Sequence, residues 1–327
     1  MAPELPDLTD LAVSGARTLR AFGQRIPGAG GILAQSLPDA IRGRIIMITG
    51  ASSGIGEATA LELGQARGTV LLVARTREKL EAVAEQVQLA GGVAYVHPCD
   101  LSRPDDIDRM ADEVLEQHGQ VDVLVNNAGK SIRRSVNRSY DRFHDYQRTM
   151  QLNYFAPVKL SLALLPTMRE RGSGHIVNIS TIGLQMNTPR FAAYLASKAA
   201  LDAFSRSIGP EIIGDGVHIT TVYMPLVRTP MIAPTKMYDR FPTMTPPEAA
   251  DMICRAMIDK PKKVGTTLGN FGELAYQVSP RGVDRILNRG YKLFPDSLAA
   301  KGGKDKKGEQ PTPESVAFAH ILRGVHW

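Results

Sequence analysis

Cysteine, tryptophan and long apolar runs are scarce in this chain of 327 residues. The two cysteines, Cys99 and Cys254, lie far apart, which excludes a disulfide framework and a thiolate metal site. No apolar run reaches the roughly 20 residues that a membrane-spanning helix needs. The acidic N-terminal segment also lacks the basic and apolar regions of a secretory signal. These absences predict a protein without a metal site that is cytoplasmic, with peripheral contact to a membrane left open as an alternative.

The charge balance is mildly basic, with a formal net charge of +6. Zinc-finger spacings are absent, and so are aromatic residues interleaved with arginine, so we expect no nucleic-acid partner. A basic excess suits anionic ligands such as nucleotides, coenzyme A or a membrane surface. The hydrophobic content of 43% and the charged content of 22% are ordinary for a globular enzyme.

Short apolar runs rich in valine and isoleucine alternate with helical patterns from residue 44 onward. Alternation of this kind predicts an α/β fold, in which one parallel, doubly wound sheet is covered by helices on both faces. The expected strands are 44–49, 69–74, 93–98, 121–125, 176–181, 217–223 and 265–268. The expected helices between them are 57–65, 77–90, 104–118, 150–169, 191–208 and 245–259.

Two extensions flank this α/β domain, which we place at residues 44–270. Residues 1–43 carry a broken helical stripe, interpreted as a helix packed on the body or on a partner subunit, or as a weak amphipathic contact with lipid or an acyl chain. Residues 224–247 form a proline-rich apolar loop long enough to be a substrate lid. Residues 271–327 are expected to be helical, with a flexible linker at 300–313.

A glycine-rich turn, Gly50-Ala-Ser-Ser-Gly-Ile-Gly56, follows the first strand and opens a helix. Glycines let a backbone approach a pyrophosphate, and a helix N-terminus favours its negative charge. This context predicts a dinucleotide site, although a tight turn without a ligand is the alternative.

The second strand ends in Arg75-Thr76, where an NAD site usually has an acidic residue. Arginine accommodates a 2′-phosphate, so NADPH is the predicted cofactor. The alternative is a surface arginine that pairs with Glu78. Asp100, at the end of the third strand, could accept a hydrogen bond from an adenine amino group or simply cap a turn.

Tyr194 and Lys198 lie four residues apart and share one face of the expected helix. An ammonium group near a phenol favours the phenolate and lowers the tyrosine pKa. Hydroxyl groups at the end of the preceding strand, on Ser180 and Thr181, could bind the same substrate oxygen. The constellation predicts a proton donor aimed at a carbonyl, which is half of a hydride transfer.

The segment 130–148 is the most basic part of the core region. It is interpreted as a solvated face with local ion pairs, or as a contact for substrate phosphates beyond a strand end. Its basic residues are Lys130, Arg133, Arg134, Arg138, Arg142 and Arg148.

Several motifs together resemble the short-chain dehydrogenase/reductase superfamily over residues 43–268. They are Thr49-Gly-Ala-Ser-Ser-Gly-Ile-Gly56, Asp100, Asn126-Asn-Ala-Gly129, Asn153, the strand end Ser180-Thr181 and Tyr194-x-x-x-Lys198. The resemblance implies a seven-stranded Rossmann sheet, NAD(P)(H) chemistry and a homodimer or homotetramer.

The resemblance also implies residue roles. Tyr194 is the acid, Lys198 holds the nicotinamide ribose and lowers the tyrosine pKa, and Asn153 positions a water in a proton relay. The superfamily's catalytic serine falls at Thr181, which we favour, with Ser180 as the alternative. The expected cofactor-binding residues are Gly50, Ser52, Ser53, Gly54, Ile55, Gly56, Arg75, Thr76, Asp100, Leu101, Asn126, Ala128, Gly129, Tyr194, Lys198, Pro225, Val227 and Thr229.

A narrower resemblance is to the bacterial long-chain fatty acyl-CoA reductases. It rests on residues 129–135 and 141–154, on the loop 224–236 and on the His-Trp terminus. It implies NADPH-dependent reduction of a fatty acyl-CoA to a fatty aldehyde, with Arg133 and Arg134 expected to meet coenzyme A phosphates. The alternatives are a superfamily reductase of a ketone, aldehyde or 3-oxoacyl thioester, and a non-catalytic dinucleotide-binding protein.

Overall fold

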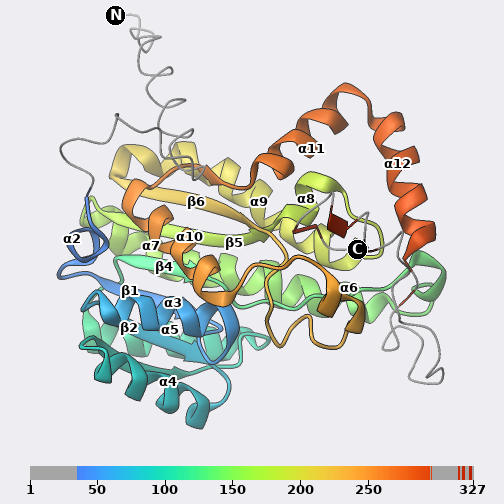
Figure 1. Ribbon diagram of the computed structural model, residues 1–327. Coiled ribbons are helices and arrows are strands. Elements are labelled where there is room, and N and C mark those ends of the chain that lie inside the picture. Colours follow the sequence, from blue (N-terminus) through green and yellow to red (C-terminus); the bar gives the residue numbers. More distant parts are fainter. Residues whose placement is uncertain (1–34, 295, 297–315, 317–318, 321–323, 326–327) are drawn as a thin grey trace, which may run out of the picture.

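The computed structural model describes residues 35–294, 296, 316, 319–320 and 324–325. Seven parallel strands form one sheet in the order β3-β2-β1-β4-β5-β6-β7, with helices on both faces (Figure 1). The predicted doubly wound parallel sheet is therefore confirmed. The strands are β1 Ile45–Thr49, β2 Thr69–Ala74, β3 Val93–Pro98, β4 Val123–Asn126, β5 Gly174–Thr181, β6 Val217–Met224 and β7 Lys263–Val264.

Successive residues of the central strands point into different cores. Ile46 and Ile48 of β1 belong to one buried cluster, whereas Met47 between them belongs to another. A strand buried on both faces needs apolar residues at every position, which explains the continuous apolar runs in the sequence.

Helices α3, α4 and α10 contribute to the first of these clusters, and α5, α7 and α9 contribute to the second. The longer helices are α3 Gly54–Gln65, α4 Arg77–Leu89, α5 Pro104–His118, α6 Phe143–Met150, α7 Ala156–Glu170, α9 Ala192–Ile212, α10 Pro246–Asp259, α11 Thr267–Val278 and α12 Pro280–Leu293. The short ones are α2 Leu37–Ile41, α8 Ile182–Met186, the 3-10 turns η1 Val136–Arg138, η3 Ile213–Asp215 and η4 Lys236–Arg240, and the π-helical turn η2 Gln151–Phe155.

The prediction of the last strand is wrong. Strand β7 covers only Lys263–Val264, and the predicted residues 265–268 instead enter helix α11. Thr266 is the N-cap of this helix, because its side chain accepts a hydrogen bond from the Gly269 amide at 3.1 Å. A threonine hydroxyl at this position favours helix initiation, which outweighs its preference for strands.

A third buried apolar cluster lies away from the sheet faces. It joins Ile182 to the loop after β6, to α12 and to residues near the C-terminus. The backbone amide of Leu226 donates to the Gly324 carbonyl at 2.7 Å, which fixes the C-terminal segment against the loop. The cluster consists of Ile182, Leu226, Met237, Tyr238, Phe241, Leu287, Phe294, Ala319 and Val325.

Most of the predicted extensions fall outside the described residues, including 1–34 and the linker 300–313. Within the described part of the chain, none of the helices has the length and apolar character needed to cross a membrane.

Candidate active site

The candidate site lies at the edge of the sheet where the carboxyl ends of β1, β4, β5 and β6 meet. In an open parallel sheet, ligands bind at this edge near the point where the strand order reverses. Here the order reverses between β1 and β4, which are neighbours in the sheet. The four strand ends lead into the glycine turn, the Asn126 turn, the Thr181 hydroxyl and the loop after β6.

The glycine turn is packed so tightly that larger residues do not fit. Gly50 has a φ of +69°, and a Cβ there would lie 2.9 Å from the Ala128 Cα. A Cβ on Gly56 would overlap the Gly50 carbonyl. Ser53, the N-cap of α3, makes no side-chain capping bond in the described structure, so the first amides of the helix remain available to an anion. This geometry fits a dinucleotide pyrophosphate.

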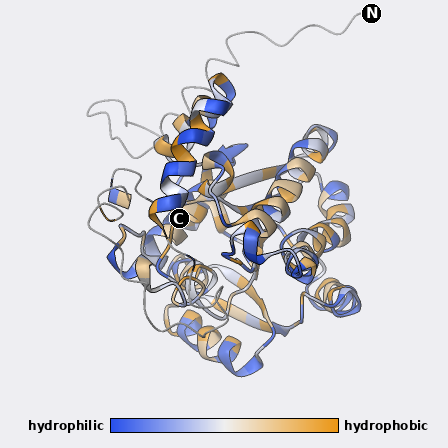
Figure 2. Cartoon of the chain, turned by 90° about the vertical axis from the view of Figure 1, so that its right-hand side faces the viewer, coloured by the Kyte–Doolittle hydropathy of each residue, from blue (hydrophilic) through white to orange (hydrophobic). Residues whose placement is uncertain are grey.

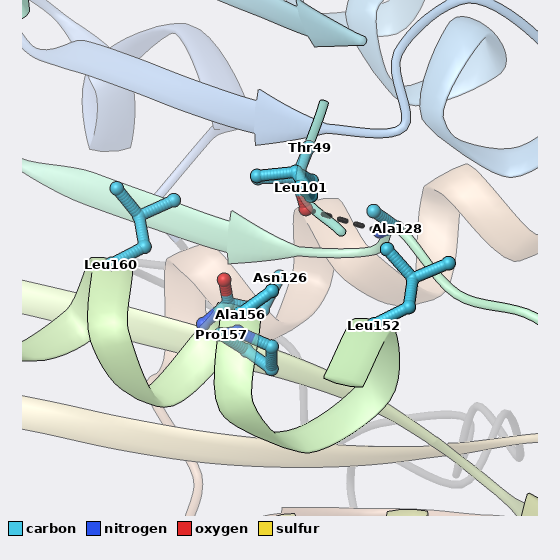
Figure 3. A pocket seen from close by; sticks show the side chains of 8 residues that line it. All are labelled: Thr49, Leu101, Asn126, Ala128, Leu152, Ala156, Pro157 and Leu160. Atoms are coloured by element: carbon cyan, nitrogen blue, oxygen red, sulfur yellow. Dashed lines mark hydrogen bonds between the residues drawn. The ribbon is translucent and has the colours of Figure 1, made fainter. Parts of the chain in front are cut away.

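The turn after β4 is tied directly to the glycine turn. The Thr49 hydroxyl accepts hydrogen bonds from the amides of Asn127 and Ala128, both at 3.0 Å, and the second bond is drawn in Figure 3. A Cβ on Gly54 would lie 3.1 Å from Thr229, so the loop after β6 also reaches this turn. Three of the segments predicted to bind cofactor therefore lie side by side.

A small pocket lies beneath the Asn126 turn rather than at Tyr194 (Figure 3). The Asn126 side-chain amide donates to Asn178 at 2.8 Å and to Ser161 at 3.3 Å, whereas its oxygen has no partner in the part of the chain that the structure describes. These bonds hold the turn firmly under the site. The pocket is lined by Thr49, Leu101, Asn126, Ala128, Leu152, Ala156, Pro157 and Leu160.

Arg75 and Asp100 lie at the ends of the neighbouring strands β2 and β3. Arg75 is exposed, and no ion pair joins it to Glu78 within the described ranges. Burial raises the pKa of Asp100, but hydrogen bonds from Ser102 and the charge of Arg75 outweigh it, so that the net pKa is lowered. Asp100 also caps a turn, because its Oδ1 accepts from the Ser102 amide at 3.0 Å and from the Ser102 hydroxyl at 2.7 Å.

Tyr194 and Lys198 lie one turn apart on α9, and both are buried. Burial raises the pKa of Tyr194 to about 12, and a side-chain hydrogen bond with Thr181 only partly offsets this effect. Burial lowers the pKa of Lys198 to about 8, and its Nζ donates to the Ile179 carbonyl at 2.7 Å. The pKa of Tyr194 is thus raised here, not lowered as predicted, because burial disfavours the charged phenolate and only the hydrogen bond with Thr181 acts in the other direction.

Asn153 lies in η2, a π-helical turn between α6 and α7, where one helix was predicted. Such turns are frequent at functional sites. Its Oδ1 accepts from the Lys130 amide at 2.8 Å, and its Nδ2 donates to the Lys130 carbonyl and to the Ser197 hydroxyl, both at 2.9 Å. A Cβ on Gly129 would lie 3.3 Å from Asn153 Oδ1 and 3.5 Å from Lys198 Nζ. The π-helical turn thus places the Asn153 side chain beside Gly129, where the Lys198 ammonium group also lies.

Sequence reasoning missed Ser197. Its hydroxyl donates to the Tyr194 carbonyl at 2.6 Å and accepts from Asn153, so it connects the π-helical turn to α9. The only signal was a small hydroxyl residue directly before Lys198.

The two strand-end hydroxyls have different surroundings. Thr181 is the N-cap of α8, and its Oγ1 accepts from the Gly183 amide at 3.1 Å in addition to its hydrogen bond with Tyr194. Ser180 is also buried, but its hydroxyl has no partner among the described residues. The Thr181 hydroxyl therefore lies next to the phenol, which the Ser180 hydroxyl does not contact in this structure.

The basic segment 130–148 is only partly a solvated face. Arg133 is buried, and Arg134 pairs with the buried Asp145 at 3.0 Å. Burial raises the pKa of Asp145, but the charges of Arg148 and Arg134 lower it more, so the carboxylate stays ionised. The arginines predicted to meet coenzyme A phosphates are thus close to the protein interior. No group of acidic, histidine or cysteine side chains in the described ranges could hold a metal ion.

Known proteins resemble this chain over most of its length. A family model described as short chain dehydrogenase matches residues 44–238. An uncharacterized oxidoreductase of Mycobacterium tuberculosis is 50% identical, covering 90% of this chain and 87% of the relative. A fatty acyl-CoA reductase of Acinetobacter baylyi is 48% identical, covering 88% of this chain and 96% of the relative.

A solved structure agrees with these matches. It is a metagenomic short-chain oxidoreductase in complex with NADP, with 33% identity and a TM-score of 0.60, covering 70% of this chain and 99% of the other. The resemblances that the motifs predicted are confirmed, and the chain belongs to the short chain dehydrogenase family of oxidoreductases.

Proposed function

We propose that this oxidoreductase uses NADPH to reduce a long-chain fatty acyl-CoA to a fatty aldehyde and coenzyme A. The observation that carries the chemistry is the buried Tyr194 phenol, hydrogen-bonded to Thr181 and one helical turn from Lys198. The substrate class is supported by the Acinetobacter baylyi relative, which is named a fatty acyl-CoA reductase.

NADPH fits the residues at the strand ends. The glycine turn would receive the pyrophosphate, and the exposed Arg75 would receive the 2′-phosphate. The NADP complex of the metagenomic relative supports the same choice. When bound, this cofactor supplies the hydride. The other residues proposed to contact it are Ser52, Ser53, Ile55, Thr76, Asp100, Leu101, Asn126, Ala128, Gly129, Lys198, Pro225, Val227 and Thr229.

The residues around Tyr194 suit reduction of a thioester. A phenol whose pKa is raised to about 12 stays protonated at neutral pH, so it can donate to the carbonyl oxygen as negative charge develops there. The Thr181 hydroxyl would bind the same carbonyl oxygen. Hydride addition and this proton transfer give a hemithioacetal, whose hydroxyl returns its proton to the Tyr194 oxygen as the carbon–sulfur bond breaks and the aldehyde forms. Thiolate is the leaving group, so no cysteine nucleophile is required, and both cysteines are buried.

The test is NADPH oxidation by purified protein with palmitoyl-CoA, with free thiol and aldehyde followed together. Tyr194→Phe is expected to lower kcat by about 10² to 10⁴, since positioned acid catalysis typically contributes that much. Tyr95→Phe is the matched control, because Tyr95 is exposed and lies on the edge strand β3, which is separated from β5 by three strands. It is expected to leave turnover unchanged.

Release of aldehyde and thiol in step with NADPH loss supports the proposal. NADPH binding without thiol release rejects the acyl-CoA substrate and favours a reductase of ketones, aldehydes or 3-oxoacyl thioesters. Binding without turnover on any carbonyl compound favours a non-catalytic dinucleotide-binding protein, which the Tyr194, Lys198 and Asn153 arrangement argues against.

A further inference from the structure

Helices α11 and α12 form an arch that stands out from the body at the carboxyl edge of the sheet (Figure 1). At its base, α11 packs on α8 through Gly269 and Gly272, where a Cβ would overlap Gln185 and Met186. At the other end, Arg190 donates to the Tyr291 carbonyl at 2.9 Å. Both ends are thus anchored, and the bend between the helices projects outward.

One face of α11 exposes large apolar side chains. Phe271 is 66% exposed, Leu274 is 57% exposed and Val278, next to the bend, is 77% exposed. Their spacing of three and four residues places them on one face of the helix, away from the glycines that meet α8. Exposed apolar residues in contiguous patches of this kind mark interaction sites.

The exposed face of α12 is basic. Arg281, Arg285, Arg289 and Lys292 recur every three or four residues, so they form one stripe along the helix. All four are exposed, and none of them has an ion pair within the described ranges. Asp284 is the only acidic residue of this helix. Figure 2, seen from the side of α12, shows hydrophilic and hydrophobic turns alternating along the arch.

We propose that this arch docks on the surface of an anionic lipid bilayer. Apolar side chains next to unpaired cations are what an interfacial helix needs, because the apolar groups enter the headgroup boundary while the cations meet lipid phosphates. Self-association through the α12 stripe would bring two rows of like charge together around a twofold axis, so charge complementarity favours lipid over a second copy of the chain. The proposal does not depend on the substrate.

The test is co-sedimentation of the full chain with vesicles of phosphatidylglycerol or of phosphatidylcholine. The wild type is expected to bind phosphatidylglycerol vesicles, and more weakly at high salt. A variant with Phe271→Ser, Leu274→Ser and Val278→Ser, and a second with Arg281→Glu, Arg285→Glu and Arg289→Glu, are each expected to lose about tenfold or more of that binding.

Matched controls lie on α4. Leu89→Ser changes an apolar residue that is 81% exposed, and Lys79→Glu reverses an exposed charge. Both are expected to bind vesicles as the wild type does, and circular dichroism establishes that every variant is folded.

Three outcomes overturn the proposal. The first is a wild type that binds neither kind of vesicle, and the second is binding that the folded arch variants retain. The third is a change of oligomeric mass in the arch variants without a change in vesicle binding, which would make the arch a subunit interface.

Discussion

The Thr181 hydroxyl serves two partners, the Gly183 amide and the Tyr194 phenol. We therefore expect Thr181→Ser to keep kcat within a few-fold, because serine retains the hydroxyl. Thr181→Val keeps the shape but removes both hydrogen bonds, and we expect kcat to fall by about tenfold to a thousandfold. Steady-state kinetics with the preferred carbonyl substrate provide the measurement.

Ser180→Ala separates the two candidate hydroxyls. The Ser180 hydroxyl has no partner among the described residues, so its loss is expected to change kcat less than Thr181→Val does. The opposite ranking would transfer the role of substrate-binding hydroxyl to Ser180.

Lys198 links stability to pH. Its pKa is lowered from 10.5 to about 8 in the folded protein, so between these values the unfolded chain binds more protons. Its contribution to stability therefore rises with pH across this window, by about 1.4 kcal/mol per pH unit. Relative to Lys198→Met, the wild type should gain stability between about pH 8 and about pH 10 in urea unfolding. If the difference in unfolding free energy between the wild type and Lys198→Met did not change with pH, the lowered pKa of Lys198 would be contradicted.

Residue positions in the site were more predictable than their electrostatics. Helical spacing was sufficient to place Tyr194 and Lys198 on one face, and the glycine turn was recognisable from its position after a strand. The direction of the Tyr194 pKa shift was not predictable, because it depends on burial by segments distant in the sequence. Ser197 was missed for the same reason, since its partner Asn153 comes from another helix.

Helix α10 begins with a capping box. Thr245 accepts from the Glu248 amide, and the Glu248 carboxylate accepts from the Thr245 amide at 2.7 Å. Thr245→Ala is expected to lower the free energy of unfolding by about 1 kcal/mol. Chemical denaturation without cofactor is the measurement.

The N-cap of α4 offers a matched control. Thr76 occupies it but makes no side-chain capping bond in the described chain, so Thr76→Ala should cost clearly less than Thr245→Ala. Equal losses of unfolding free energy in the two variants would mean that the capping bonds at Thr245 do not contribute to stability.

The elements that a sequence pattern marks, such as a continuous apolar run, agreed with the prediction. The elements that depend on capping or on packing against other segments did not. Six strands were placed within a few residues, because double-sided burial leaves continuous apolar runs. The last strand was misplaced because β-branched residues 266–267 look like a strand, whereas Thr266 caps a helix. The π-helical turn at Asn153 has no periodic signature that distinguishes it from the helix around it.

The third apolar cluster joins residues near the C-terminus to the loop after β6. Val325 and Phe294 pack with Leu226 of the segment 224–247, which we propose is a lid over the site. No sequence pattern predicts this contact, because it joins segments that are about 100 residues apart and its energy comes from nonlocal packing.

Val325→Asp would place an unpaired carboxylate in this cluster, which is costly. The two clusters on the sheet faces do not include Val325, so we expect a folded protein with a loosened segment 224–247. Limited trypsin digestion should then cleave faster at the exposed Arg228 and Arg240. Leu89→Asp, at an exposed position, is the control, and equal cleavage rates would show that Val325 does not hold the segment.

The two edges of the sheet are unequal. Strand β7 has two residues, whereas β3 has six. No described strand pairs with the outer side of β3. Unpaired edges template further strands, so aggregation of concentrated or heat-damaged protein is expected to start along β3, where Val93 and Tyr95 are partly exposed. Pro98 ends this edge and lacks an amide hydrogen, which shortens the ladder that two molecules can form.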